Sequence, residues 1–457
     1  MSRSPGDAPP DDAAAQARAH EIYREVLRRA PEHDFSPTLD RVRDVCDLLG
    51  GVHRASPMIH LTETNGKTST ARMVERLLRE LGLRTGRFTS PHLADVRERI
   101  AIDGEPISAE RFVEVWADVE PYIAMVDERS RSAGGPRLSF FEVFTVMGFA
   151  AFADAPVDVA VVEVGMGGRW DATNVADGTV AVITPIARDH ERWLGYDLVD
   201  IAVEKAGIIK DGATVVIAEQ AEQVAAVLAE ATADHGARAV VENRDIAVVA
   251  REVALGGQVV TLQGLGGLYT DIFLPLHGPH QAHNALLALA AVEAFLGGAA
   301  LDGGVVEQAF ASVDSPGRLE VVRRSPTVLV DAAHNAAGVE ALAVALDEAF
   351  AFTRLVGIVG VLADKDAEAI LAGLEPVLAE VVVSRSASAR AMDVDVLAEV
   401  ARDVFGEDRV LVAERLDEAL DLAVARAEAD GEPRGTGVLA TGSITVVAEV
   451  RQLLGRP

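Results

Sequence analysis

Hydrophobic residues occur in short consecutive runs along the chain, and these runs alternate with longer segments whose apolar positions recur every three or four residues. The short runs are rich in valine and are apolar at successive positions rather than at alternate ones. This pattern is typical of strands that are buried on both faces of a parallel sheet. The predicted strands cover residues 157–164, 179–184, 214–218, 327–331, 355–361, 380–384, 409–413 and 437–441.

One helical segment is clear because Met73, Val74, Leu77, Leu78 and Leu81 fall on one face of a helix with about 3.6 residues per turn. The stretch directly before it, "IHLTETNGKTST" (residues 59–70), therefore joins a strand to a helix. Strands that alternate with helices in this way predict an α/β fold.

A Pro-Gly turn in "SVDSPGRLE" (residues 312–320) separates a helical segment from a new series of strands. We predict a large N-terminal α/β domain with a mostly parallel sheet over residues 19–313, and a smaller Rossmann-like α/β domain over residues 317–457. Residues 1–18 are rich in Ala, Asp, Pro and Ser and lack the apolar run of a signal peptide, so we expect a disordered tail.

Composition narrows the possible classes of protein. The chain has 457 residues, of which 49% are hydrophobic, which is enough for domains with real cores. Its net charge of -29 argues against a surface for nucleic acid or acidic membrane, so an anionic ligand needs a local basic pocket. The most hydrophobic stretch, residues 285–301, is interrupted by Glu293 and is too short to span a membrane.

The single cysteine, Cys46, excludes an intramolecular disulfide and a thiolate metal cluster. This usage suits a reducing compartment, and we expect a buried structural thiol in a cytoplasmic protein.

The stretch at residues 59–70 has the features of a phosphate-binding loop. In such a loop, backbone N–H groups at a helix N-terminus point at phosphate, a lysine adds positive charge, and a hydroxyl reaches Mg²⁺. Gly66, Lys67, Thr68 and Ser69 supply these groups, but Glu63 stands where such a loop is expected to have glycine. The same pattern is also compatible with a helix cap followed by a surface lysine.

Two further clusters follow strands. Glu163 ends an apolar run in "VVEVGMGGRWDATNV", and the carboxyl ends of parallel strands are where open α/β sheets bind ligands. His190 follows the next strand, and Lys205 lies in the helix after it. Taken singly, Glu163 is equally compatible with a solvated strand end, a lone histidine is more often structural than a ligand, and a lone lysine is usually solvated. Their occurrence together favours a site.

Several longer strings carry a family resemblance. "TNGKTS", "TSPHLADVRERI", "EVGMGGRWDATNV", "EKAGIIK", "HQAHNALLALAA", "PGRLE", "DAAHN", "DKD" and "TGS" occur in the order typical of the bifunctional folylpolyglutamate synthases and dihydrofolate synthases of the Mur ligase family. The similar segments extend from about residue 38 to the C-terminus. The resemblance implies a P-loop ATPase domain followed by a glutamate-ligase domain.

The resemblance also implies roles for single residues. Lys67 and the loop at residues 64–69 would hold the phosphates of ATP, and Lys205 would be carbamylated and would orient the second of two Mg²⁺ ions. Lys67, Lys205, His190 and Glu163 would be the catalytic residues. The remaining assignments are Thr64, Asn65, Gly66, Thr68, Ser69, Asn284, Arg318 and Asp331 for ATP; Ser90, Glu163 and His190 for Mg²⁺; and Phe141, Asp171, His334 and Ser443 for the folate and glutamate substrates.

The implied activity is ATP-dependent ligation of L-glutamate to dihydropteroate or to the terminal glutamate of a folate, through an acyl phosphate, by a cytoplasmic monomer. Two alternatives stay open at this point. Glu63 would suit a catalytically impaired folate- or nucleotide-binding homologue, and another Mur-family amino-acid ligase would use the same loop. Arg188, in "ARDH", departs from the small and apolar pair that the family has before its Asp-His.

Overall fold

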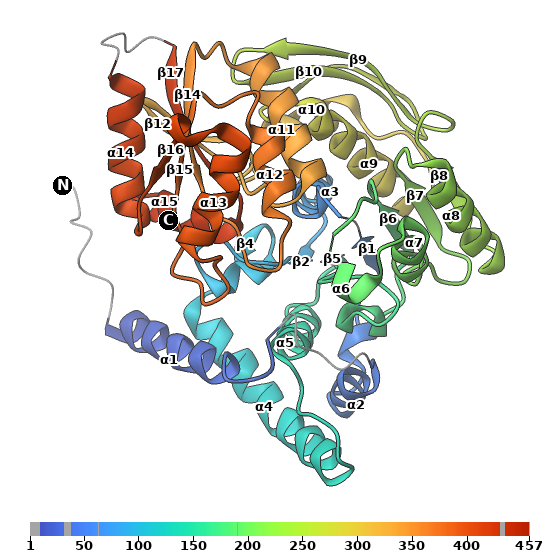
Figure 1. The fold of residues 1–457 in the computed structure, drawn as a ribbon. Helices are drawn as coiled ribbons and strands as arrows, with labels where there is room; N and C mark the ends of the chain where they lie inside the picture. The colour runs from blue at the N-terminus through green and yellow to red at the C-terminus, as the bar shows by residue number, and fades with distance from the viewer. Residues whose placement is uncertain (1–9, 32–37, 63, 190, 430–434, 457) are drawn as a thin grey trace.

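The computed structural model describes residues 10–31, 38–62, 64–189, 191–429 and 435–456. Figure 1 shows two α/β units side by side, with the N-terminal half in blue to green and the C-terminal part in orange to red.

The larger unit is built on an eight-stranded sheet with the order β4-β3-β2-β5-β1-β6-β7-β8. The strands from β2 to β8 in this order are parallel, and β3 and β4 are added antiparallel at one edge. The strands are β1 (Met58–Thr62), β2 (Thr85–Phe88), β3 (Ile100–Ile102), β4 (Glu105–Pro106), β5 (Val159–Glu163), β6 (Val180–Ile183), β7 (Thr214–Ile217) and β8 (Arg238–Val241).

The register of this sheet brings the ends of three strands together. In the pairing of β1 with its neighbours, Leu61 lies opposite Glu163 of β5 and Thr62 lies opposite Ile183 of β6. The loop after β1, the carboxylate that ends β5 and the segment after β6 therefore meet at one edge of the sheet.

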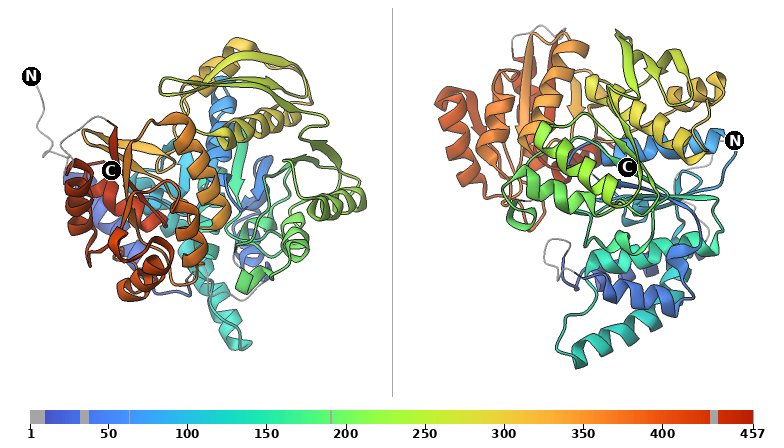
Figure 2. Two further views of the ribbon diagram at one scale, coloured as in Figure 1. Left: turned by 45° about the horizontal axis from the view of Figure 1, so that its top comes forward. Right: turned by 90° about the vertical axis from the view of Figure 1, so that its right-hand side faces the viewer.

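Helices cover both faces of the sheet, so its central strands β1, β5 and β6 are buried at every position. One face packs against α3 (Lys67–Glu80), α9 (Pro279–Phe295) and α10 (Gly303–Ala311). The opposite face packs against α2 (Asp40–Leu48), α4 (Ala109–Ser132) and α5 (Phe140–Asp154), with α1 (Pro10–Val26) on α4. Figure 2 shows this blue-to-teal helical layer below the rest of the molecule.

The remaining elements of the larger unit follow β6. Helices α6 (Glu191–Leu194), α7 (Leu198–Ala206) and α8 (Glu222–Asp234) precede a three-stranded antiparallel sheet of β9 (Ala247–Ala254), β10 (Gly257–Gln263) and β11 (Leu268–Leu274). Short 3-10 turns are η1 (Val52–Arg54), η2 (Val96–Arg99) and η3 (Ala172–Val175), with η4 (Glu407–Arg409) in the smaller unit.

The smaller unit has a six-stranded sheet with the order β12-β13-β17-β14-β15-β16, parallel except for β12. Helices α11 to α13 pack on one face, and α14 and α15 pack on the other. The elements are β12 (Glu320–Arg324), β13 (Thr327–Val330), α11 (Ala336–Ala349), β14 (Arg354–Val359), α12 (Ala367–Leu374), β15 (Glu380–Val383), α13 (Val394–Phe405), β16 (Val410–Val412), α14 (Leu416–Glu428), β17 (Thr436–Thr441) and α15 (Ile444–Leu453).

The predicted α/β fold class is confirmed, and each of the predicted strands coincides with a strand of one of the two large sheets. The predicted tail is wrong for residues 10–18, which begin helix α1; Ile22 and Val26 of this helix are buried, so packing orders a segment whose composition suggests disorder. Residues 1–9 lie outside the described residues. None of the described helices has the length and apolar character that crossing a membrane requires.

The predicted division at residues 312–320 falls between α10 and β12, and among the described residues no strand of one large sheet pairs with a strand of the other. We propose these limits as domain boundaries on that basis. The single cysteine is buried, and burial raises the pKa of the Cys46 thiol to about 12, as expected for a structural thiol.

Candidate active site

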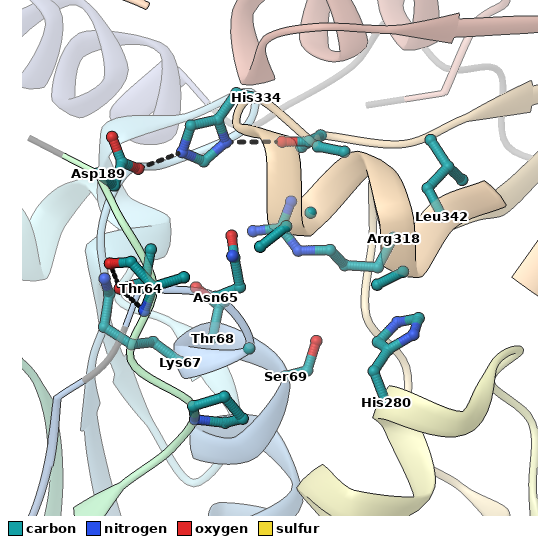
Figure 3. A pocket seen from close by; sticks show the side chains of 18 of the residues that line it. Thr64, Asn65, Lys67, Thr68, Ser69, Asp189, His280, Arg318, His334 and Leu342 are labelled. Atoms are coloured by element: carbon teal, nitrogen blue, oxygen red, sulfur yellow. Dashed lines mark hydrogen bonds and ion pairs between the residues drawn. The ribbon is translucent and has the colours of Figure 1, made fainter. Parts of the chain in front are cut away.

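A cavity of about 960 Å³ lies between the two units, at the edge of the larger sheet where β1, β5 and β6 end. Its wall comes from the loop after β1, from helices α7 and α9, and from the segments that follow β13 and β17 of the smaller unit. Figure 3 shows side chains from both units facing this space.

The loop after β1 is fixed by contacts with the segment after β6. The Thr64 hydroxyl donates to the carbonyl of Ala187 at 2.9 Å, and the Ala187 N–H donates to the Thr64 hydroxyl oxygen at 3.0 Å. Gly66 then turns the chain into α3 with a φ of +99°, a conformation that favours glycine. The amides at the start of this long helix, together with Lys67, form a site suited to phosphate.

Glu163 is a fully buried carboxylate at the end of β5. It accepts a hydrogen bond from the Thr68 hydroxyl at 3.0 Å. Burial raises the pKa of Glu163 to about 7, and the nearby Lys67 cation, the Thr68 hydroxyl and the Ser90 backbone N–H oppose that rise. Lys67, Thr68, Ser90 and Glu163 therefore converge on one corner of the cavity.

Two predicted residues of this corner, Glu63 and His190, lie outside the described residues. Among all residues that the structure describes, no three His, Cys, Asp or Glu side chains lie close enough together to hold a metal ion. The described oxygen donors at this corner are the Glu163 carboxylate and the hydroxyls of Thr68 and Ser90.

Lys205 lies near the end of α7, is 3% exposed and lines the cavity. The glycine-rich loop after β5 holds this helix in place: the N–H of Arg169 donates to the carbonyl of Glu204 at 2.9 Å, and the N–H of Trp170 donates to the Glu204 carboxylate at 3.2 Å. The strings "GMGGRW" and "EKAGI" thus bring Lys205 to the cavity that Glu163 also lines.

Three residues predicted to bind the nucleotide line another part of the cavity. Asn284, on α9, is buried and donates to the side chain of Gln281 at 3.2 Å. Asp331, after β13, accepts the backbone N–H groups of Leu319 at 2.7 Å and Ala333 at 2.8 Å. Burial raises the pKa of Asp331, and the Arg318 cation opposes the rise.

The two residues predicted to bind glutamate, His334 and Ser443, line the side of the cavity that belongs to the smaller unit. Nδ1 of His334 donates to the carbonyl of Ala332 at 2.8 Å, which leaves Nε2 3.5 Å from a carboxylate oxygen of Asp189. Ser443 caps α15 and accepts the N–H of Val446 at 3.3 Å.

Phe141 and Asp171 do not line the cavity. The Phe141 ring packs against the ring of Phe88, with centroids 5.8 Å apart, and over Gly165. Asp171 is buried and caps η3, and its carboxylate accepts from the N–H groups of Met166 and Thr173. Their predicted contact with the pterin ring stays a prediction.

Sequence reasoning gave no role to a network that joins the two units at the cavity wall. Lys365 pairs with Asp189 at 2.5 Å, and both side chains are 7% exposed. Asn335, the cap of α11, donates to Asp189 at 3.0 Å and exchanges hydrogen bonds with Asn65 of the phosphate loop at 3.1 Å. Asn335 and Lys365 lie in the strings "DAAHN" and "DKD". These strings carry the family resemblance, but the sequence alone assigned no role to either residue.

Comparison with known proteins agrees with this geometry. Residues 140–292 match the Mur ligase middle domain, and residues 317–444 match the Mur ligase glutamate ligase domain. A phosphate loop on one α/β unit that faces a glutamate ligase domain across a cavity defines the class: an ATP-dependent ligase.

Individual relatives narrow the class further. The chain is 51% identical to the dihydrofolate synthase/folylpolyglutamate synthase of Mycobacterium tuberculosis, over 98% of this chain and 95% of that protein. It is 30% identical to the protein of the same name from Escherichia coli, over 91% of each. A crystal structure of M. tuberculosis folylpolyglutamate synthase complexed with ADP and AMPPCP superimposes with a TM-score of 0.92 at 51% identity, covering 98% of this chain and 100% of that one. The chain belongs to the dihydrofolate synthase/folylpolyglutamate synthase family of Mur ligases.

Proposed function

We propose that the protein attaches L-glutamate to dihydropteroate, to the terminal glutamate of a folate, or to both, using ATP. The observation that carries this function is a single cavity lined on one side by the phosphate loop and Glu163, and on the other by His334 and Ser443. The phosphates and the incoming amino acid would therefore meet across the cavity.

ATP is the substrate that makes the reaction possible, because an unactivated carboxylate has a poor leaving group. The acceptor carboxylate attacks the γ-phosphorus, the bond to the ADP oxygen breaks, and an acyl phosphate forms. The α-amine of glutamate then attacks the acyl carbon, loses a proton and expels phosphate, which leaves an amide. Lys67 and the loop amides would stabilise the charge that develops on the phosphoryl oxygens.

The nucleoside would lie against the described residues farther along the cavity. We assign the adenine and phosphate contacts to Asn284 and Arg318, and the ribose contact to Asp331, because all three line the cavity together. The network of Asp189, Asn335 and Lys365 would hold the units closed and exclude the water that hydrolyses an acyl phosphate.

The residues present fit Mg²⁺. A cation would stabilise the charged form of Glu163, whose buried carboxylate has a raised pKa, and the Thr68 and Ser90 hydroxyls beside it are the hard oxygen donors that Mg²⁺ prefers. We propose two Mg²⁺ ions, held by Ser90, Glu163 and His190, with a carbamate on Lys205 orienting the second. When bound, these ions neutralise charge on the phosphates.

A product assay tests the function. Dihydropteroate and a reduced folate are supplied in parallel with ATP and glutamate, and ADP release is compared with the ligated product. We expect ADP release to depend on both acceptor and glutamate, and Glu163→Gln to lower turnover by orders of magnitude with the fold intact. ADP release without a ligated product from either acceptor would overturn the assignment.

The Lys205 carbamate has a matched control in the same string. Lys205→Ala is expected to be nearly inactive and to recover in part with added short carboxylates, which replace the missing anion. Lys210 lies five residues on and pairs with Asp177 at 3.4 Å, so Lys210→Ala removes a lysine side chain that does not line the cavity and is expected to stay active. If no carboxylate restores Lys205→Ala, the carbamate is wrong.

We further propose that the protein acts as a monomer in the cytoplasm. One chain supplies both sides of the cavity, and the lone cysteine is buried. Light scattering of the purified protein, with and without ATP, would reveal a dimer.

A further inference from the structure

A second cavity, of about 560 Å³, adjoins the first. It lies along the flank of α3, between the β2–β4 edge of the larger sheet, the segment at residues 312–318 and helix α15. Thr68, Pro91, Arg318 and Ile444 line both cavities, so the second one begins beside the phosphate loop.

The wall of this cavity is rich in arginine, in a protein whose net charge is -29. The acidic side chains of the wall are largely engaged. Glu75 forms a buried pair with Arg87 at 2.5 Å, and Glu98 accepts the backbone N–H groups of residues 93–95. The lining arginines are Arg72, Arg76, Arg79, Arg87, Arg318 and Arg451.

Three of these arginines form a row on one face of α3. Arg72, Arg76 and Arg79 follow one another at helical spacing, where neighbouring like charges destabilise a helix. Burial and the neighbouring Arg87 cation lower the pKa of Arg72, although Asp314 lies 3.2 Å away. Arg76 also pairs with Glu80 on the same helix, so Arg79 is the arginine of the row whose charge has no ion-pair partner among the described residues.

The far end of the row is open to a ligand. Arg79, at this end, and Arg318, at the opposite end beside the phosphate loop, form no ion pair within the part of the chain that the structure describes, and Arg79 lies over Gly104. An added Cβ at Gly104 would come within 1.9 Å of Nη1 of Arg79, so glycine makes the room that the guanidinium occupies. We call the row of Arg72, Arg76 and Arg79 the arginine groove, which ends beside the phosphate loop at Arg318, the residue assigned to the nucleotide.

The spacing of the groove indicates the class of anion. Successive arginines of the row are four and three residues apart, which is about 6 Å and about 4.5 Å along the helix axis at a rise of about 1.5 Å per residue. A γ-linked glutamate adds five backbone bonds, an extended length of about 6 Å, and carries one α-carboxylate. A carboxylate of such a chain would thus face one guanidinium per helical turn, a pairing that arginine favours.

We propose that the arginine groove binds the α-carboxylates of the oligo-γ-glutamate tail of a folate substrate. This inference rests on the proposed function, because it is the ligase that lengthens such a tail. The terminal γ-carboxylate lies beside Thr68, where the groove meets the phosphate loop, and the preceding residues of the tail follow α3.

Direct binding tests the groove without catalysis. Free tri-γ-glutamate, which lacks a pterin, is titrated into the full-length protein by calorimetry at low salt. We expect Arg72→Gln/Arg79→Gln to weaken binding at least tenfold, whereas Arg129→Gln/Arg131→Gln, on exposed positions of α4, removes the same charge without effect. The side chain of Asp314, the ion-pair partner of Arg72, is largely exposed, and exposed pairs stabilise a fold little. We therefore expect Arg72→Gln/Arg79→Gln to keep the melting temperature of the wild type.

Equal affinity of the wild type and the groove variant would overturn the proposal. So would binding of inorganic phosphate in the same titration without binding of tri-γ-glutamate, because the cavity would then serve the released phosphate.

Ligation kinetics distinguish tail binding in the arginine groove from the ligation reaction itself. We expect the ratio of the KM for a folate triglutamate to the KM for the monoglutamate to rise at least tenfold in Arg72→Gln/Arg79→Gln and to stay constant in the α4 control. An unchanged ratio of the two KM values would show that the glutamate tail does not bind in the arginine groove. A wild type that binds tri-γ-glutamate but ligates no acceptor would overturn the proposed function and leave the groove standing.

Discussion

At the scale of single residues, His60 shows how the strand before the phosphate loop is held. Its Nε2 lies 2.8 Å from the Thr173 hydroxyl, and that hydroxyl donates to the Asp171 carboxylate at 2.5 Å. Because the hydroxyl proton is used on Asp171, Nε2 of His60 must be the donor, and Nδ1 carries no proton. Burial, aided by the Lys210 cation, lowers the pKa of His60 to about 3.

The lowered pKa predicts an acid-sensitive fold. The folded-state pKa of His60, about 3, lies below the ordinary value of 6.5, so its contribution is fully present above pH 6.5 and is lost as pH falls. The loss is about 1.4 kcal/mol per pH unit, or about 2 kcal/mol between pH 6.5 and 5. Urea unfolding at pH 7 and pH 5 measures how much of the free energy of unfolding is lost on acidification. We expect this loss to be smaller in His60→Gln than in the wild type by about 2 kcal/mol.

His20→Gln, at an exposed position of α1, is the control and should retain the pH dependence of the wild type. A wild-type slope in His60→Gln would show that the buried imidazole does not set the acid sensitivity.

Glu63 is a second residue-scale test, argued from sequence because it lies outside the described residues. A carboxylate about 5 Å from a phosphate at an effective dielectric of about 20 costs roughly 3 kcal/mol at most. Glu63→Gly should therefore lower the KM for ATP and leave the KM for glutamate nearly unchanged. A higher KM for ATP would make Glu63 a useful part of the loop, and ATP binding only in the variant would indicate a disabled ligase.

At the scale of elements, the glycine-rich loop after β5 joins a strand to a helix that is distant in sequence. An added Cβ at Gly168 would lie 2.8 Å from the backbone oxygens of both Glu204 and Lys205, and one at Gly165 would lie 2.4 Å from the Phe141 ring. Gly168 therefore lets the loop pack directly on the end of α7, which sets the position of Lys205, while Gly165 lets the loop pack on the Phe141 ring of α5.

Gly168→Ala tests that packing. The methyl group would force the loop away from α7, at a cost of about 1–3 kcal/mol, and would displace Lys205. We expect a lower melting temperature and a lower ligation rate. Gly303→Ala is the matched control, because an added Cβ there meets no atom within 4 Å and its backbone φ is not positive; it should leave both quantities nearly unchanged.

At the scale of the whole molecule, contacts at the cavity wall hold the two units together. Asp189 of the larger unit accepts from Lys365 and Asn335 of the smaller one, in a largely buried environment. Removing one partner of a buried ion pair typically costs about 3–5 kcal/mol, whereas an exposed pair contributes about 1 kcal/mol or less.

Lys365→Met should therefore lower both the free energy of unfolding and the rate of ligation, and small-angle scattering should show a larger radius of gyration with ATP bound. A double-mutant cycle with Asp189→Asn should give a coupling energy well above 1 kcal/mol. Arg385→Met, which breaks an exposed pair with Glu414, is the control. Additive effects of Lys365→Met and Asp189→Asn would show that the pair does not hold the units closed.

The sequence by itself determined the α/β fold and the central strands, because a strand buried on both faces must be apolar at every position. It also determined the phosphate loop, since Gly66, Lys67 and Thr68 are adjacent and the helix that follows fixes their geometry. The antiparallel strands β9 to β11 escaped prediction because they are partly exposed and lack continuous apolar runs. Helix α1 escaped because its order depends on packing against α4.

Only the tertiary structure decided which distant residues meet. Asn65 and Asn335 are 270 positions apart, and Lys365 and Asp189 are 176 apart, yet each pair is in hydrogen-bond contact across the cavity. The arginine groove of α3 likewise ends beside Arg318 of the segment between the units. Local patterns encode the helix and strand that carry each side chain, but contacts between the two units depend on how their separate cores are oriented when they pack together.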